Sequence, residues 1–262
     1  MIPDRLPDEL MDAVKECPAG MLQFEIGIQT FNEAVAHRIQ RPLNIDQIEA
    51  NLRRLRSESG VHIHADLIAG LPGEDMESFA AGFNRLLMLN PQEIQLGILK
   101  RLRGAPIDRH TREWNMVYSP HAPYEILQTS LIPFEQMQRI QRFARYWNLT
   151  VNSGRFIRTA PLIWQDAVSP FAAFMQWSDW LYVQTNTTGN LHMVRLARLL
   201  MQFLAEEKGN QEKIIAAALW SDYQRGNRPD IPGFLKKFGF EKTTADPVRS
   251  NAPLPRQARH IQ

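Results

Sequence analysis

The residues whose types and spacing are best suited to chemistry are His62, His64 and Asp66, which alternate along the run "VHIHADLIAG". Residues two apart share one face of a β-strand, so a strand here carries two imidazoles and a carboxylate on the same side. Buried without partners, three such groups would be costly, and we expect them to line a wet or ligand-filled cavity. A solvated strand edge and a zinc or iron site remain open alternatives, since neutral imidazoles and a carboxylate are suitable metal ligands.

Further polar groups accompany two other predicted strands. The run "MLQFEIGIQ" alternates between an apolar face and a polar face that carries Glu25, Gly27 and Gln29. The run "EIQLGILK" is followed by a cluster of basic side chains, which are Lys100, Arg101 and Arg103. These cations would either neutralise an anionic substrate or face solvent.

Helices must separate these strands. Apolar spacing predicts a short helix over residues 34–39 and longer helices over residues 44–59 and 76–89, with Asn44 as the N-cap of the second. Strands that alternate with helices favour a parallel sheet, in an α/β barrel or a doubly wound fold. In both folds the site lies at the carboxyl ends of the strands.

The turn "GLPGED", residues 70–75, follows the second predicted strand. Its glycines suit a tight connection between strand and helix. Glu74 and Asp75 then begin a helix, where they would favour the helix dipole and repel a phosphate. We therefore reject a dinucleotide-binding or phosphate-binding loop.

The second part of the sequence has a different pattern. Residues 104–132 are predicted to be irregular, residues 133–147 form an amphipathic helix, and residues 161–240 form only helices. From Glu241 to Gln262 the chain is basic, contains three prolines and is poor in apolar residues, which is typical of a solvated tail.

Composition excludes several classes of function. The chain has 262 residues, of which 44% are hydrophobic, and its 30 basic and 28 acidic side chains are too balanced for a nucleic-acid-binding surface. Neither a run of roughly 20 apolar residues nor a signal-peptide pattern is present, so we expect a cytoplasmic protein that does not enter a membrane. Cys17 is the single cysteine, which excludes a disulfide or a cysteine-built metal site within the chain.

Several runs, taken in order, resemble a known enzyme family. They are "GIQTF", an arginine twelve residues after Gln29, "HADLIAGLPGED" and "LNPQEIQLGILKRL". Together they resemble the second half of the barrel of radical S-adenosylmethionine (SAM) proteins, and they are similar to the oxygen-independent coproporphyrinogen dehydrogenases and their relatives. The fuller run from "LGILKRLRGAPI" through "PYEIL" to "NSGRF" resembles a bacterial group of cobalamin-binding radical SAM proteins whose C-terminal domain has no assigned function.

This resemblance implies a fold and a division into domains. The fold class is α/β, with the second half of a partial (β/α)6 radical-SAM-type barrel in residues 1–103. A mainly helical C-terminal domain of unknown function would occupy residues 104–240, and a flexible basic tail would occupy residues 241–262.

The resemblance also implies contacts to SAM. By analogy with the family, Gln29 and Asp66 bind the ribose, and Arg41 pairs with the methionyl carboxylate. Backbone groups at Ile68 and near Lys100 flank the adenine. An amide and a carboxylate suit sugar hydroxyls, and a guanidinium suits a carboxylate.

The chain departs from the family at the iron–sulfur cluster. The family holds a 4Fe–4S cluster through a Cys-x-x-x-Cys-x-x-Cys loop, and Cys17 has no such companions. We therefore expect the C-terminal portion of a larger radical SAM enzyme, whose missing N-terminal half, in cis or in trans, provides the cluster and the cobalamin site.

This expectation has consequences for activity. Reductive cleavage of SAM would belong to the full-length parent, while the isolated chain would supply part of the SAM pocket and be inactive. The alternative is a non-enzymatic half-barrel that binds SAM or a partner. The small-molecule substrate stays open, and the chain itself is expected to provide no metal ligand.

Overall fold

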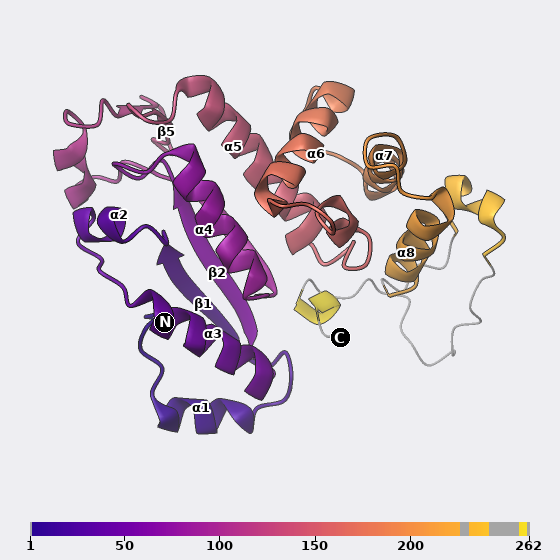
Figure 1. The fold of residues 1–262 in the computed structure, drawn as a ribbon, viewed down its shortest axis with the longest axis horizontal. Coiled ribbons are helices and arrows are strands. Elements are labelled where there is room, and N and C mark those ends of the chain that lie inside the picture. The colour runs from indigo at the N-terminus through magenta and orange to yellow at the C-terminus, as the bar shows by residue number, and fades with distance from the viewer. Residues whose placement is uncertain (1, 226–230, 241–256, 261–262) are drawn as a thin grey trace. The chain divides into compact units, whose positions relative to one another are not determined.

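The computed structural model describes residues 2–225, 231–240 and 257–260 (Figure 1). The chain divides into two compact units, residues 1–144 and residues 145–262. The predicted domain boundary after residue 103 remains a prediction. The predicted tail, residues 241–262, lies outside the described residues except for 257–260.

The first unit is built on a three-stranded parallel sheet in the order β1 (Gln23–Gln29), β2 (His62–Ala69), β3 (Glu93–Ile98). Because the strands are parallel, their carboxyl ends lie at one edge of the sheet. The prediction of an α/β fold with parallel strands is confirmed. The described strands form an open sheet and do not close a barrel, so the partial barrel remains a proposal.

One face of the sheet is apolar. Ile26, Ile28, Ile63 and Leu67 are buried there. Figure 1 shows the two longer helices of this unit, α3 (Ile45–Glu58) and α4 (Met76–Met88), on the same side of the strands. The alternation of apolar residues in the strands thus determines which face the helices cover.

The helices of this unit begin at polar caps that satisfy otherwise unpaired backbone N–H groups. Asn44 Oδ1 accepts a hydrogen bond from Gln47 N at 3.0 Å and caps α3, which confirms the predicted cap. Asn32 caps α2 (Glu33–Arg38), and Asp75 caps α4. A further helix, α1 (Asp8–Lys15), precedes the sheet.

The opposite face of the sheet carries the polar residues. Glu25 and Gln95 are exposed, and His64 and Asp66 are half-buried. In the register of the strands Gly27 is opposite Asp66, and Asp66 is opposite Gln95. The polar face therefore brings the candidate residues of three chain segments into adjacent rows.

The rest of the first unit contains a small hairpin that the sequence did not predict. After the 3-10 helix η1 (Pro106–His110), β4 (Val117–Tyr118) pairs antiparallel with β5 (Ile126–Gln128). Strands of two and three residues are too short to show an alternating pattern. The long helix α5 (Phe134–Trp147) follows and runs across the boundary between the units.

The regular elements of the second unit are all helices among its described residues, as predicted for residues 161–240. Its elements are η2 (Asn148–Asn152), η3 (Ala160–Ile163), α6 (Pro170–Thr185), α7 (Met193–Glu206), α8 (Glu212–Arg225), η4 (Gly233–Phe238) and η5 (Gln257–His260). Aromatic contacts form its core, among them Trp177 against Phe203 with ring centroids 5.2 Å apart. Within the described ranges, every helix is too short or too polar to cross a membrane.

Candidate functional site

The side chains of Gln29 and Arg41 both approach Gly27 on the polar face of β1. A Cβ atom built on Gly27 would overlap Gln29 Nε2 and would lie 3.5 Å from Arg41 Nη2. The absence of a side chain at Gly27 therefore leaves the space into which both polar groups reach. The structure thus brings together two of the residues predicted to bind SAM.

Gln29 has an unusual conformation at the carboxyl end of β1. Its φ is 73°, in the left-handed region, and the register with β2 shifts between Gly27 and Gln29. Such a φ is uncommon for a residue other than glycine and turns the end of the strand. The Oε1 atom of Gln29 is buried and has no hydrogen-bond partner among the described residues. It is therefore an acceptor that a ligand could satisfy.

Asp66 lies on β2 directly opposite Gly27. Its side chain is 30% exposed, and its Oδ1 is 3.6 Å from His64 Nε2. Burial raises the pKa of Asp66, although the charge of His64 opposes the rise and the charge of Glu25 adds to it. A half-buried carboxylate of this kind gains from hydrogen-bond donors such as hydroxyl groups.

Arg41 lies in the connection between α2 and α3. Its backbone N–H donates to Ala36 O at 2.8 Å, which folds the chain back onto the end of α2. Arg41 is exposed, and no ion pair involves its guanidinium within the described part of the chain. It is therefore available for an anionic group such as a carboxylate.

Ile68 and Lys100 lie toward the same edge of the sheet. Ile68 is half-buried and pairs with Gly97 of β3. Lys100 is exposed just beyond β3, where its backbone bridges to Glu125. Both residues share the carboxyl edge with Gln29, as the parallel order requires.

The metal-site alternative finds no support in the described residues. His62 is buried and its Nε2 is 3.2 Å from Glu93 Oε1, an interaction within the sheet. His64 Nε2 is buried without a hydrogen-bond partner, and Asp66 is its nearest acidic neighbour on β2. Among the described side chains, no three His, Cys, Asp or Glu groups gather as metal ligands would.

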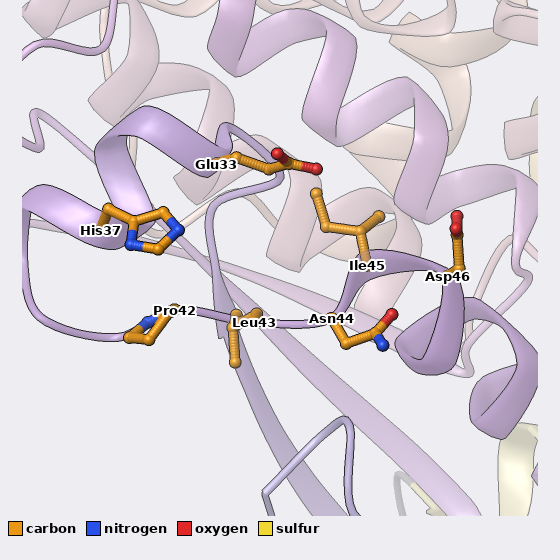
Figure 2. Close-up of a pocket in the computed structure, with 7 residues that line it drawn as sticks. All are labelled: Glu33, His37, Pro42, Leu43, Asn44, Ile45 and Asp46. Carbon is orange, nitrogen blue, oxygen red and sulfur yellow. The ribbon is translucent and has the colours of Figure 1, made fainter.

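A pocket of about 400 Å³ lies beside α2 (Figure 2). Figure 2 shows Glu33 and His37 on α2 facing the segment from Pro42 to Asp46. The lining residues are Glu33, His37, Pro42, Leu43, Asn44, Ile45 and Asp46. Gln29, Arg41 and Asp66 do not line this pocket, so it is distinct from the arrangement around Gly27. We base the site on that arrangement because it holds the unpartnered amide oxygen.

The sequence analysis missed two buried residues beside Gln29. Glu74, interpreted there only as an acid at a helix start, is 2% exposed, and the adjacent Asp75 caps the helix. Thr30, the neighbour of Gln29, is 3% exposed and donates its hydroxyl hydrogen to Glu74 Oε1 at 2.5 Å. The position of Glu74 directly after the Gly-Leu-Pro-Gly turn was the one available signal in the sequence. Its partner could not be identified in this way, because Thr30 is 44 positions away.

The comparisons with known proteins match different lengths of the chain. The sequence model of the family described as "Protein of unknown function (DUF4080)" matches residues 112–257, more than half of the chain.

Curated relatives match smaller parts. The uncharacterized protein YtqA of Bacillus subtilis is 27% identical over 139 residues, which are 52% of this chain and 43% of YtqA. The ribosomal protein uS12 methylthiotransferase RimO of Trichlorobacter lovleyi is 35% identical over 78 residues, 29% of this chain and 17% of RimO. The anaerobic coproporphyrinogen III oxidase 1 of Cereibacter sphaeroides is 36% identical over 78 residues, with the same shares.

The chain thus spans less than half the length of these relatives. It has distant, partial homology to radical SAM proteins, in agreement with the resemblance of its motifs.

Proposed function

The chain belongs to the DUF4080 family of proteins of unknown function, and we propose that it supplies the ribose-binding and carboxylate-binding part of a SAM site in a radical SAM enzyme. The observation that carries the proposal is the approach of both Gln29 and Arg41 to Gly27, with Gln29 Oε1 unpartnered among the described residues. Asp66, opposite Gly27 in the register, adds a carboxylate to the same face.

The residues fit the polar groups of SAM. The amide of Gln29 both donates and accepts, and the carboxylate of Asp66 accepts, so the pair suits the two ribose hydroxyls. The Arg41 guanidinium suits the methionyl carboxylate. Backbone groups at Ile68 and near Lys100 would flank the adenine. SAM supplies an adenosyl radical in radical SAM enzymes, and the residues of this chain would bind and orient SAM.

The same residues do not fit an iron–sulfur cluster. A cluster needs several thiolates, and Cys17, the single cysteine, donates its thiol hydrogen to Ala13 O at the end of α1. The proposal therefore assigns the cluster, and the cobalamin site of the parent enzyme, to a missing N-terminal half in cis or in trans.

Strand β1 offers a place for that half. It is at the edge of the described sheet, with β2 on one side only. A strand at the edge of a sheet can pair with a further strand. Cleavage of SAM would need both halves, and the reaction and the small-molecule substrate stay open. The second candidate, a non-enzymatic half-barrel that binds SAM or a partner, uses the same residues around Gly27.

The experiment compares two ligands that differ at the methionyl group. SAM carries the carboxylate, whereas 5′-methylthioadenosine keeps the adenosine and lacks the carboxylate. Each is titrated into the isotope-labelled full chain, and the side-chain amide signal of Gln29, assigned by its loss in Q29A, is followed by NMR. We expect saturable shifts of this signal with both ligands.

Variants separate the two contacts. R41Q should weaken SAM by about tenfold, as for a lost charged hydrogen bond, and leave methylthioadenosine unchanged. D66N should weaken both ligands, and Q23A, an exposed glutamine on the same strand face, should change neither. The proposal fails if millimolar SAM leaves the Gln29 signal unmoved, or if R41Q weakens both ligands equally.

A further inference from the structure

The turn of residues 70–74, which connects β2 to α4, contacts both chain segments that carry the proposed site. Glu74 at its end is buried, and Glu74 Oε1 accepts the hydroxyl hydrogen of Thr30 at 2.5 Å. Thr30 directly follows Gln29 at the carboxyl end of β1. One bond of the turn is therefore made to the residue next to the ribose-binding amide.

The Thr30 hydroxyl continues this connection into α2. Thr30 Oγ1 accepts from Asn32 N at 2.9 Å, while Asn32 Oδ1 accepts from Val35 N and caps the helix. Asn32 Nδ2 donates to Ser78 Oγ at 2.9 Å on α4. The end of β1, the start of α2 and the start of α4 thus share one hydrogen-bond network, and networks of this kind fix side-chain and backbone geometry.

The turn also holds the other end of α2. Arg38 Nη1 donates to Pro72 O at 3.0 Å, and its guanidinium lies 4.6 Å from the ring centroid of Trp114. Gly73 has a φ of +82°, and a Cβ there would overlap Arg38 Nη1. Only a glycine suits that φ and that approach. Arg38 is three residues before Arg41, so this second bond fixes the segment that leads to the carboxylate-binding guanidinium.

Gln29 requires such support because its left-handed φ is unfavourable for a residue with a side chain. A conformation of this kind persists only where surrounding contacts determine it. The bond from Thr30 to Glu74 begins one residue after the unfavourable φ and is buried, where a hydrogen bond is strongest.

We infer that the turn of residues 70–74 is a positioning element for the SAM site, in which Glu74 orients Gln29 through Thr30 and Pro72 orients Arg41 through Arg38. This inference rests on the proposed function for the identity of the ligand. It assigns the two bonds to different parts of that ligand, the ribose and the methionyl carboxylate.

The test uses two substitutions in the full chain with the ligands SAM and 5′-methylthioadenosine. T30V removes the hydroxyl and keeps the shape, and we expect roughly fivefold weaker binding of both ligands because Gln29 contacts the ribose that they share. R38Q should weaken SAM by a similar factor and leave methylthioadenosine unchanged. T30S keeps the hydroxyl group and should bind both ligands with wild-type affinity.

A readout without ligand separates this inference from the proposed function. In T30V the side-chain amide signal of Gln29, and the backbone coupling that reports its φ, should both move, whereas in T30S both should stay. D222N, which disturbs a buried carboxylate in the second unit, is the control for a general loss of stability and should leave these signals unchanged.

The outcomes are distinct. If wild type binds SAM through Gln29 but T30V and R38Q change neither affinity nor the Gln29 signals, the positioning inference is overturned and the proposed function stands. If wild type does not bind SAM, the proposed function fails, and the ligand-free Gln29 signals in T30V still decide whether the turn orients that residue. If T30V does not fold, the ligand selectivity of R38Q decides.

Discussion

At the scale of single residues, Glu74 is a carboxyl group of the first unit that is almost completely buried. Burial raises its pKa to about 7 from an ordinary 4.5, against the hydrogen bonds from Thr30 and Ser78 and with a contribution from the charge of Asp75. Because the folded-state pKa lies above the unfolded value, the protonated form is favoured by folding.

The raised pKa of Glu74 predicts that the stability of the protein depends on pH. The contribution of Glu74 is fully present below about pH 4.5 and is lost as the pH rises through 7. We expect the difference in free energy of unfolding between wild type and E74Q to fall by up to about 3 kcal/mol from pH 4.5 to pH 8. Urea unfolding of both proteins across this range measures it. A difference that stays constant would mean that Glu74 titrates normally.

Gly27 supplies a second prediction at this scale. G27A places a methyl group where Gln29 Nε2 lies and should displace the amide. The far end of a flexible side chain can move at little cost, so the unfolding midpoint should change little while SAM affinity falls by about tenfold, as for a lost site contact. The matched control is G189A, since a Cβ at Gly189 meets nothing within 4 Å. Unchanged SAM binding by G27A would remove Gly27 from the site.

The sequence predicted the polar-face residues of this site better than the buried residues that support them. Alternation along two strands was enough to put Gln29 and Asp66 on one polar face, because the period of a strand is fixed. It could not pair Thr30 with Glu74, since that bond joins positions 44 apart and depends on how the turn folds back. The predicted helix start was right to within a residue, since Asp75 caps α4, but the sequence did not indicate that Glu74, the residue before the cap, is buried.

At the scale of elements, the strands and helices with clear periodicity were predicted within a few residues. α3 begins at its predicted cap, Asn44, and β2 matches the run that carries His64. The β4–β5 hairpin was missed because its strands are too short to have a period. The pairing of His62 with Glu93 was also missed, since it depends on the register between β2 and β3 rather than on either strand alone.

In the second unit, Asp222 of α8 connects elements that are distant in sequence. Its Oδ1 accepts from Arg158 N at 2.9 Å, and its Oδ2 accepts from the backbone and hydroxyl groups of Thr159 at 3.0 and 2.7 Å. Burial nevertheless raises the pKa of Asp222 to about 6. The carboxylate thus ties α8 to the segment that precedes η3.

Removing this carboxylate predicts a local loss of stability. D222A leaves three donors without their acceptor, two of them on a fully buried threonine, and should lower the free energy of unfolding by about 3 kcal/mol. Tryptophan fluorescence during urea unfolding is a suitable measurement, because five of the six tryptophans are in the second unit, at positions 147, 164, 177, 180 and 220. D179N, an acid on α6 that is not buried, serves as the control. A loss below about 0.5 kcal/mol would show that the three bonds contribute little.

At the scale of the whole molecule, the described structure contains an open three-stranded sheet and a helical unit, and the DUF4080 match covers that unit as far as residue 257. The alternation of strands and helices led to the α/β prediction, and the parallel sheet confirms it. Closure of a barrel could not be decided from these motifs, because closure depends on strands beyond the three that they cover. Further strands of a barrel would have to pair with an edge of the described sheet, and β1 is one such edge.

The cysteine content allows a direct test of the proposal that a separate half provides the cluster. A 4Fe–4S cluster needs several thiolates from one site, and this chain offers Cys17 alone. Anaerobic reconstitution of the isolated chain with iron and sulfide should therefore give no cluster absorbance above that of C17S, and no 5′-deoxyadenosine after addition of SAM and a reductant. The C17S variant measures adventitious iron, since it differs only in the thiol. A cluster spectrum that appears in wild type and disappears in C17S, together with 5′-deoxyadenosine, would show that copies of this chain assemble a cluster among themselves, and the proposal of a separate cluster-bearing half would then be wrong.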